Sequence, residues 1–172
     1  MANVDLKAPT LLALKELLRP LGYRKSSSLF SRPLRDVVHL IEVQGSRQST
    51  AAEAKFTVNI GVFVPALVYA DVRETTKPSI PVAHWRERMG FLSPEHEDTW
   101  WNVRTPQQAE AVANDIASRI ERIALPALAQ LQQLESLVSL WQAGRSPGLT
   151  EHQRKEFLAR LGQVQSNAAS AA

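Results

Sequence analysis

The spacing of hydrophobic residues predicts one helix at the start of the chain, extended segments in its middle and further helices at its end. Over residues 11–18, leucines recur at intervals of three and four, which places them on one face of a helix. Pro20 and Gly22 end this pattern. We therefore expect a first helix that packs on a core through its leucines.

The clearest strand is predicted over residues 55–64, where every second residue is apolar. The positions of this apolar face are Phe56, Val58, Ile60, Val62 and Val64. A strand with this alternation buries one face. Short apolar runs between turn-forming residues predict four more strands. They cover residues 23–32, 36–44, 84–92 and 99–104.

The last third of the chain is predicted to be helical. A threonine followed by a proline at 105–106 is a typical helix start, with the threonine as N-cap. Apolar residues at helical spacing follow, and Pro126 is expected to break or kink that helix. A second amphipathic segment runs from Leu128 to Trp141 and ends at Gly144. This segment packs either on the chain's own sheet or on a second copy, and the second case would make a homodimer through the C-terminal helices.

The order of these elements predicts an α+β fold. No helix lies between consecutive strands, so no parallel crossover is available and the sheet is expected to be antiparallel. We expect a meandering sheet of about five strands, preceded by one helix and followed by three helices that pack on one face. A last helix that ends before Gly162 completes a single domain over residues 1–162, in which residues 127–162 are a helical extension. Residues 163–172 have little to bury, so a disordered tail is expected.

Length and composition exclude several classes of protein. A chain of 172 residues suits one domain, and the absence of cysteine excludes a disulfide scaffold, a thiolate metal site and a cysteine nucleophile. Lys15 and Glu16 interrupt the leucine-rich stretch near the start, and no apolar run approaches the ~18 residues of a membrane span. We therefore expect no signal peptide, no membrane contact and a cytoplasmic location.

Positive charge is concentrated in the first third of the chain. The formal net charge is +3, and residues 1–50 carry eight Lys and Arg against four Asp and Glu. An excess this small is weak support for a nucleic-acid partner, so nucleic-acid binding is kept as an alternative. That alternative would use Arg19, Arg24, Lys25, Arg32 and Arg35.

Common catalytic and metal-binding signatures are absent from the sequence. It has no Gly-rich phosphate loop, no Gly-x-Ser-x-Gly motif and no His-Glu-x-x-His pair, and its four histidines are scattered. The acidic run at 95–98 is either a weak cation or acid–base site or a solvated loop. We favour the loop, because consecutive side chains do not all point at one centre. We therefore expect no catalytic residue, no metal and no cofactor.

The strand pattern predicts a polar face on the far side of the sheet. If the apolar face of residues 55–64 lies toward the helices, Asn59 faces away from them. The same alternation turns Gln44, Arg86 and Arg88 outward. The residues of strand 84–92 that are then expected in the core are Trp85, Met89 and Phe91.

Trp100 and Trp101 are adjacent in a predicted strand and therefore point to opposite faces of the sheet. One of them enters the core, and the other covers a helix or a partner. The candidate partner-binding residues are Gln44, Asn59, Arg86, Arg88 and Trp100. The arginines supply planar, multi-donor hydrogen bonding. The alternative is that this face is only the solvated side of a one-sided sheet.

Several short motifs along residues 10–130 resemble one family when they are taken in order. They are Leu-Arg-Pro-Leu-Gly-Tyr-Arg-Lys at 18–25, Phe30 with Arg32, Gln-Gly-Ser at 44–46, Phe-Thr-Val-Asn-Ile-Gly-Val at 56–62, Arg-Met-Gly at 88–90, Trp100–Trp101 and Leu125–Pro126. Their order and spacing resemble the bacterial family of the domain of unknown function 4304. The resemblance implies a small soluble bacterial protein, with no activity or catalytic residue to carry over. It also implies that some relatives act as antitoxins beside secreted toxins.

These observations predict a non-enzymatic protein that binds another protein, such as an immunity protein that neutralises a toxin. The alternatives are the nucleic-acid-binding module and a small enzyme of unknown reaction that uses Glu42 or Asn59. Inhibitors of nucleases commonly carry an acidic face, whereas the net charge of this chain is positive. A toxin partner is therefore not expected to be a nuclease.

Overall fold

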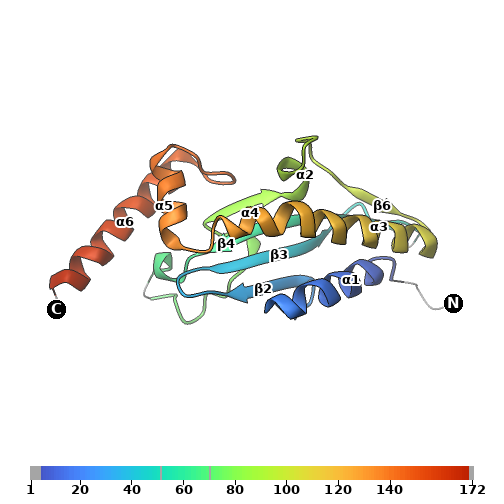
Figure 1. Ribbon diagram of the computed structural model, residues 1–172, viewed down its shortest axis with the longest axis horizontal. Coiled ribbons are helices and arrows are strands. Elements are labelled where there is room, and N and C mark those ends of the chain that lie inside the picture. The colour runs from blue at the N-terminus through green and yellow to red at the C-terminus, as the bar shows by residue number, and fades with distance from the viewer. Residues whose placement is uncertain (1–4, 51, 70, 171–172) are drawn as a thin grey trace.

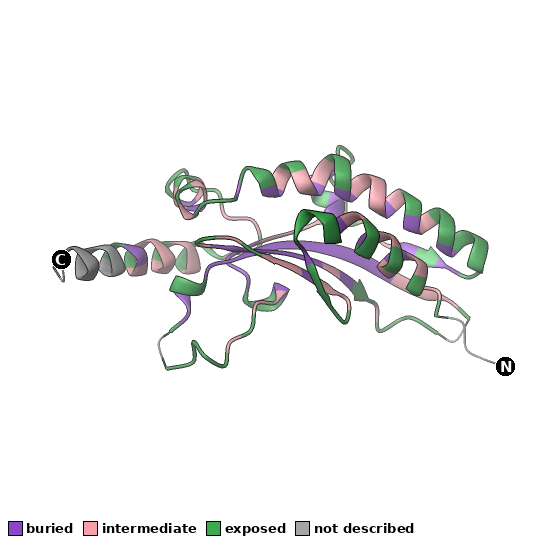
Figure 2. Ribbon diagram, turned by 60° about the horizontal axis from the view of Figure 1, so that its bottom comes forward, coloured by how far each residue is buried: buried purple, intermediate pink, exposed green. Residues whose placement is uncertain are grey.

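A layer of helices covers one face of an antiparallel sheet (Figures 1 and 2). The computed structural model describes residues 5–50, 52–69 and 71–170, with side chains up to residue 162. Over these residues the sheet has six strands. They are β1 (Arg24–Ser26), β2 (Leu29–Pro33), β3 (Val38–Gly45), β4 (Ala54–Phe63), β5 (Trp85–Arg88) and β6 (Trp101–Val103). The predicted α+β fold is confirmed.

The strands form a meander in the order β1-β2-β3-β4-β5, and β6 also pairs with β4. β5 pairs with residues 59–62 of β4, and β6 pairs with residues 54–56 of the same strand. β3 and β4 are therefore the central strands, and alternate residues of β4 face the helices as its sequence predicts. Register places Asn59 between Glu42 of β3 and Arg88 of β5 on the other face.

Two of the predicted strands differ from those in the structure. Residues 23–32 form two strands, β1 and β2, joined by a tight turn in which Ser27 has a positive φ of 54°. The segment 84–92 is a strand only as far as Arg88, and the short helix α2 (Met89–Leu92) follows. Trp85 and Met89 are buried as predicted, but the prediction for Phe91 is wrong, because the change from strand to helix leaves its side chain 37% exposed.

The helices begin with α1 (Ala8–Leu18), which is extended by the short 3-10 turn η1 (Arg19–Leu21). The long helix of the C-terminal third begins at α3 (Pro106–Arg119), where the backbone N–H of Gln108 donates to the N-cap hydroxyl of Thr105 at 3.2 Å. Of the break or kink expected at Pro126, the break does not occur, because the helix continues through the proline. The π-helical turn η4 (Ile120–Ala124) precedes α4 (Leu125–Ala129), which contains the proline. A π turn changes the backbone pairing where a proline ring and its missing N–H would otherwise disrupt the helix.

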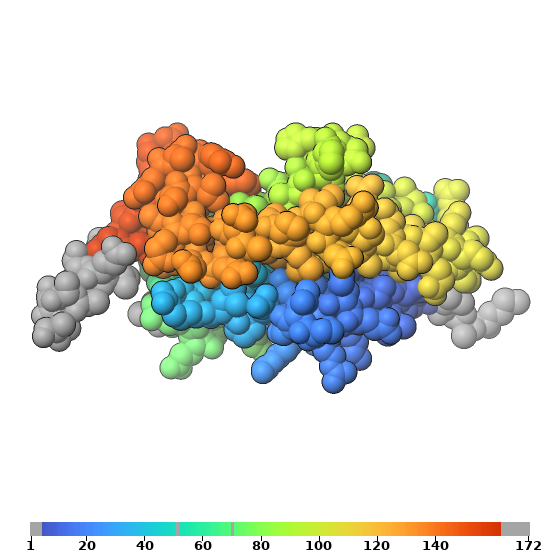
Figure 3. All heavy atoms as spheres, in the orientation of Figure 1, coloured from blue at the N-terminus to red at the C-terminus, as the bar shows by residue number. Residues whose placement is uncertain are grey.

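The main core lies between the sheet and the helix layer, where α1 and α3 run side by side (Figure 3). The stripe expected between Leu128 and Trp141 lies in α4 and in α5 (Leu134–Gln142). Its residues Leu128, Leu137 and Trp141 are fully or almost fully buried within this chain. Apolar burial against the sheet therefore accounts for this stripe without a second copy.

The last helix, α6 (Glu151–Ser170), runs past Gly162, where the sequence pattern ends it. Its first half packs beside α5 and the short turn η2 (Pro65–Leu67). The side chains of residues 163–172, where a disordered tail is expected, lie outside those that the structure describes. The disorder of this tail stays a prediction. No helix among the described residues is long and apolar enough to cross a membrane.

The second face of the sheet is covered over only part of its area. Residues 64–69 and 71–83, which include the turn η3 (Ile80–Val82), cross one end of β3 and β4 (Figure 2). They form a smaller apolar cluster with that end of the two strands. The members of this cluster are Val38, Leu40, Phe63, Val68, Ile80 and Ala83. The polar ends of β3 and β4 remain uncovered beside it.

Candidate functional site

A cavity of about 570 Å³ lies on the uncovered part of the second sheet face. Four of the five predicted residues line it: Gln44, Asn59, Arg86 and Arg88. They come from β3, β4 and β5. Side chains alternate between the two faces of each strand, and the register places these four on the same face. The other lining residues are Glu42, Ile80, Pro81, Glu87, Phe91 and Gly148. We call this hollow the sheet-face cavity.

Asn59 is the buried centre of a polar network in the sheet-face cavity. Its side-chain amide donates to the Oε1 atom of Gln44 at 2.6 Å and to the Oε2 atom of Glu42 at 3.4 Å. A buried amide needs such partners, because an unmade hydrogen bond there costs about 1–3 kcal/mol. The three side chains therefore hold one another in a fixed arrangement on β3 and β4.

Arg86 builds a wall of the sheet-face cavity. Its Nε atom donates to the carbonyl oxygen of Gly148 at 3.0 Å, and its Nη1 atom donates to the carbonyl oxygen of Pro81 at 2.6 Å. The guanidinium thereby ties the loop before α6 to the segment that covers the apolar end of the sheet. Gly148 has a φ of 74° and leaves no room for a Cβ atom beside Arg86. Arg86 positions these two segments, since its donors are directed at backbone carbonyls.

Arg88 joins the sheet-face cavity to Trp100, the fifth predicted residue. Its Nη1 atom lies 2.7 and 2.6 Å from the two carboxylate oxygens of Asp98. The indole Nε1 atom of Trp100 donates to the same carboxylate at 3.1 Å, and the Arg88 guanidinium lies 5.1 Å from the Trp100 ring centroid. The hydrogen bond from Arg88 lowers the pKa of Asp98. Trp100 itself does not line the cavity but lies directly beside it, while Trp101 enters the core.

The acidic run 95–98 is divided among different partners, as expected of a loop. Asp98 pairs with Arg88, whereas Glu95 lies 3.6 Å from Arg119 of α3. Within the described part of the chain, no group of three or more His, Asp or Glu side chains could hold a metal ion. The carboxylates of this run thus brace the loop against two separate elements.

Phe91 and Glu87 are cavity residues that the sequence pattern did not identify. Phe91 was assigned to the core, although Gly90 and the following Ser-Pro pair at 93–94 were available signals that the strand ends. Glu87 is half-buried, and its burial raises the pKa of its carboxyl. Its Oε1 atom accepts a hydrogen bond from the backbone N–H of Arg88 at 3.2 Å.

The two buried histidines are bonded to backbone and are not directed into this cavity. The Nε2 atom of His39 lies 3.0 Å from the carbonyl oxygen of Leu131. The Nδ1 atom of His84 accepts the backbone N–H of Val64 at 3.0 Å. Burial lowers the pKa of both rings. Both histidines connect the sheet to the segments that cover it.

The basic residues of the nucleic-acid alternative are only partly brought together. Arg19, Arg24 and Lys25 line one small cavity near α1. Arg35 lies on the turn after β2 and pairs with Asp36 at 2.8 Å. Three of the five residues therefore share one cavity, and Arg35 lies outside it.

The helix, the antiparallel meander and the covering helices define a one-sheet α+β protein with a polar cavity on its second sheet face. The family model described as a domain of unknown function (DUF4304) matches residues 14–130, which is more than half of the chain. The chain belongs to this family. No curated protein and no solved structure matches it. The matched region contains all of the cavity-lining residues except Gly148.

Proposed function

We propose that this protein binds another protein through the sheet-face cavity and that the partner is a toxin which it neutralises. The observation that carries the proposal is the grouping of Phe91 and Arg88 in the sheet-face cavity with Trp100 directly beside it. Phe91 is 37% exposed at the cavity, and Trp100 is half-buried against Arg88. Aromatic residues and arginine supply much of the binding energy at protein interfaces.

The polar groups of the cavity favour recognition over catalysis. Asn59 is occupied by Gln44 and Glu42, Arg86 by backbone carbonyls, and Arg88 by Asp98. A general acid or base must reach a substrate proton, and a set of groups already bonded to one another offers less for that purpose. A fixed set of this kind suits a preorganised binding surface, because little ordering entropy is lost when the partner docks.

The charge of the cavity favours a partner that is not strongly basic. Its charged lining consists of Glu42 and Glu87 against Arg86 and Arg88, so the formal charges cancel. An inhibitor of a basic nuclease commonly carries an acidic face, because complementary charge strengthens binding and speeds association. The family resemblance, which implies that some relatives act as antitoxins, supports a toxin as the partner. The balanced charge of the cavity supports a toxin that is not a nuclease.

Co-expression with the product of the neighbouring gene tests this proposal. If that product is a toxin, the wild-type chain is expected to restore growth and to co-purify with it. The Phe91→Ala/Trp100→Ala variant is expected to do neither while keeping its circular dichroism spectrum. Arg104→Ala is the matched control, because Arg104 is exposed and pairs with Glu53 away from the cavity. If the double variant still restores growth and still co-purifies with the toxin, the assigned binding surface is contradicted.

A further inference from the structure

A second cavity, of about 290 Å³, lies at the edge of the sheet that β1 forms, between the end of α1 and this strand. Four cationic side chains and two aromatic ones line it. They are Lys15, Arg19, Arg24 and Lys25, with Tyr23 and Phe30. We call this hollow the basic cavity.

The charge of the basic cavity is not compensated within the chain. None of its four cationic side chains forms an ion pair or a side-chain hydrogen bond with the residues that the structure describes. Arg32 lies near enough to Tyr23 to affect its ionisation. The carboxylate of this region is Glu16, which lines an adjoining hollow with Lys15 and Arg19. Five cations against one anion leave a local charge of +4, and a bound anion would relieve their repulsion.

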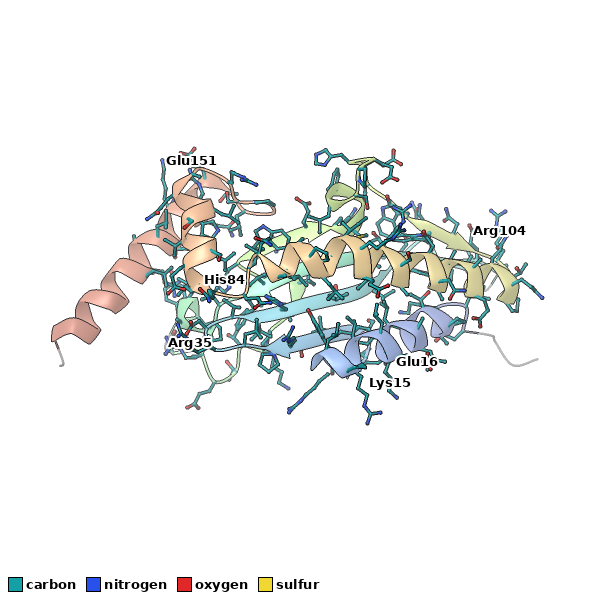
Figure 4. The ribbon with its side chains drawn as sticks, viewed as in Figure 1. Lys15, Glu16, Arg35, His84, Arg104 and Glu151 are labelled. Atoms are coloured by element: carbon teal, nitrogen blue, oxygen red, sulfur yellow. The ribbon has the colours of Figure 1, made fainter. Side chains whose placement is uncertain are left out.

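The cations project from two separate elements toward solvent. Figure 4 shows Lys15 and Glu16 on the side of α1 that faces away from α3. Arg24 and Lys25 belong to the exposed edge strand β1. Because a helix and a strand contribute to it, the basic cavity can surround an anion from more than one side, unlike a row of charges along a single helix.

Tyr23 gives a second, independent indication of a ligand. Its side chain is 5% exposed and lines the basic cavity, yet its hydroxyl has no hydrogen-bond partner among the described residues. Buried polar groups are nearly always paired, so such an exception requires an explanation. Burial raises the pKa of Tyr23 to about 12, which keeps the hydroxyl protonated. A protonated hydroxyl can donate to an anionic oxygen.

We propose that the basic cavity binds the phosphate groups of a small molecule. Arginine recognises phosphate oxygens through two parallel N–H donors, and lysine adds point charge. A local charge of +4 suits a diphosphate or triphosphate better than a single carboxylate. The aromatic side chains Tyr23 and Phe30 are buried and offer no ring face on which a base could stack, which argues against single-stranded nucleic acid.

Titration calorimetry of the full chain with inorganic pyrophosphate at low salt tests this proposal. The wild type is expected to bind with 1:1 stoichiometry. Arg19→Ala/Arg24→Ala is expected to weaken binding about 100-fold, because each lost charge-assisted hydrogen bond corresponds to about tenfold. Arg47→Ala/Lys77→Ala removes the same charge from exposed positions outside the cavity and is expected to leave binding almost unchanged. Absence of pyrophosphate binding, or equal weakening in both double variants, overturns the proposal.

Tyr23→Phe separates a ligand-binding hydroxyl from a merely structural one. Removing an unpaired buried hydroxyl is expected to leave the melting temperature unchanged or to raise it, while pyrophosphate binding weakens about tenfold. Unchanged binding would overturn the role of Tyr23. The same titration is carried out with duplex and single-stranded oligonucleotides in place of pyrophosphate. Tight, steeply salt-dependent binding of an oligonucleotide without binding of pyrophosphate would replace the small molecule by nucleic acid and overturn the proposal.

Discussion

Acidification is expected to destabilise this protein through His84, which connects the second sheet face to α6. The imidazole ring of His84 lies 5.3 Å from the ring centroid of Phe63 and 4.9 Å from that of Phe157 in α6. Its Nδ1 atom accepts the backbone N–H of Val64. Protonation would remove this acceptor and place a positive charge between two phenyl rings.

The size of the effect follows from the pKa difference between the folded and unfolded chain. Burial, with a further contribution from Arg160, lowers the pKa of His84 to about 4, whereas an exposed histidine titrates at about 6.5. Between these values the unfolded state binds more protons, so stability is lost as the pH falls from 6.5 to 4. The full difference corresponds to about 3 kcal/mol, of which about 2 kcal/mol is lost between pH 7 and pH 5.

Urea unfolding of the wild type and of His84→Asn, at pH 7 and at pH 5, measures this contribution. The asparagine amide oxygen can accept the Val64 N–H but does not titrate. The wild type is expected to lose about 2 kcal/mol more than the variant between the two pH values. His39 is also buried with a lowered pKa, but it contributes equally to both proteins and cancels. Equal losses in both proteins would refute this account of His84.

Three further perturbations test other parts of the structure. In urea unfolding, Gly90→Ala is expected to lower the free energy of unfolding by about 2–3 kcal/mol, because the new Cβ atom would overlap the backbone of the loop that follows α2. Gly45→Ala is the matched control, because a Cβ atom at Gly45 meets nothing within 4 Å. Arg88→Ala is expected to raise the pKa of Asp98 toward its ordinary value in an NMR titration, and an unchanged value would contradict the pairing of these two side chains. Ile116→Ala in the core is expected to cost about 2–5 kcal/mol by the same unfolding assay, and a cost near zero would contradict its burial.

The composition of the sheet-face cavity could be predicted largely because strand periodicity is a local property. Once the apolar residues of β4 are assigned to the core, alternation places Asn59 on the other face. The same alternation places Gln44, Arg86 and Arg88 there, and the register confirms this arrangement. Their role in binding remains a prediction.

The parts that sequence reasoning missed depend on contacts between distant segments. Phe91 leaves the core because the chain turns into α2, where Gly90 packs against the backbone of a later loop. The continuation of the helix through Pro126 depends on a π-helical turn that has no apolar period of its own. The extent of the sheet-face cavity depends on residues 64–69 and 71–83, which have loop composition but cover one end of the second face with apolar side chains.

Site-specific photo-crosslinking tests most directly that the sheet-face cavity is the protein-binding surface. A photoreactive phenylalanine analogue would replace Phe91 at the cavity or Leu12 on α1, two exposed hydrophobic positions of the folded chain. In cells that also express the partner, position 91 is expected to yield one discrete adduct, position 12 is expected to yield none, and Arg88→Ala is expected to abolish the adduct. Adduct formation at position 12 without any at position 91 would contradict the account.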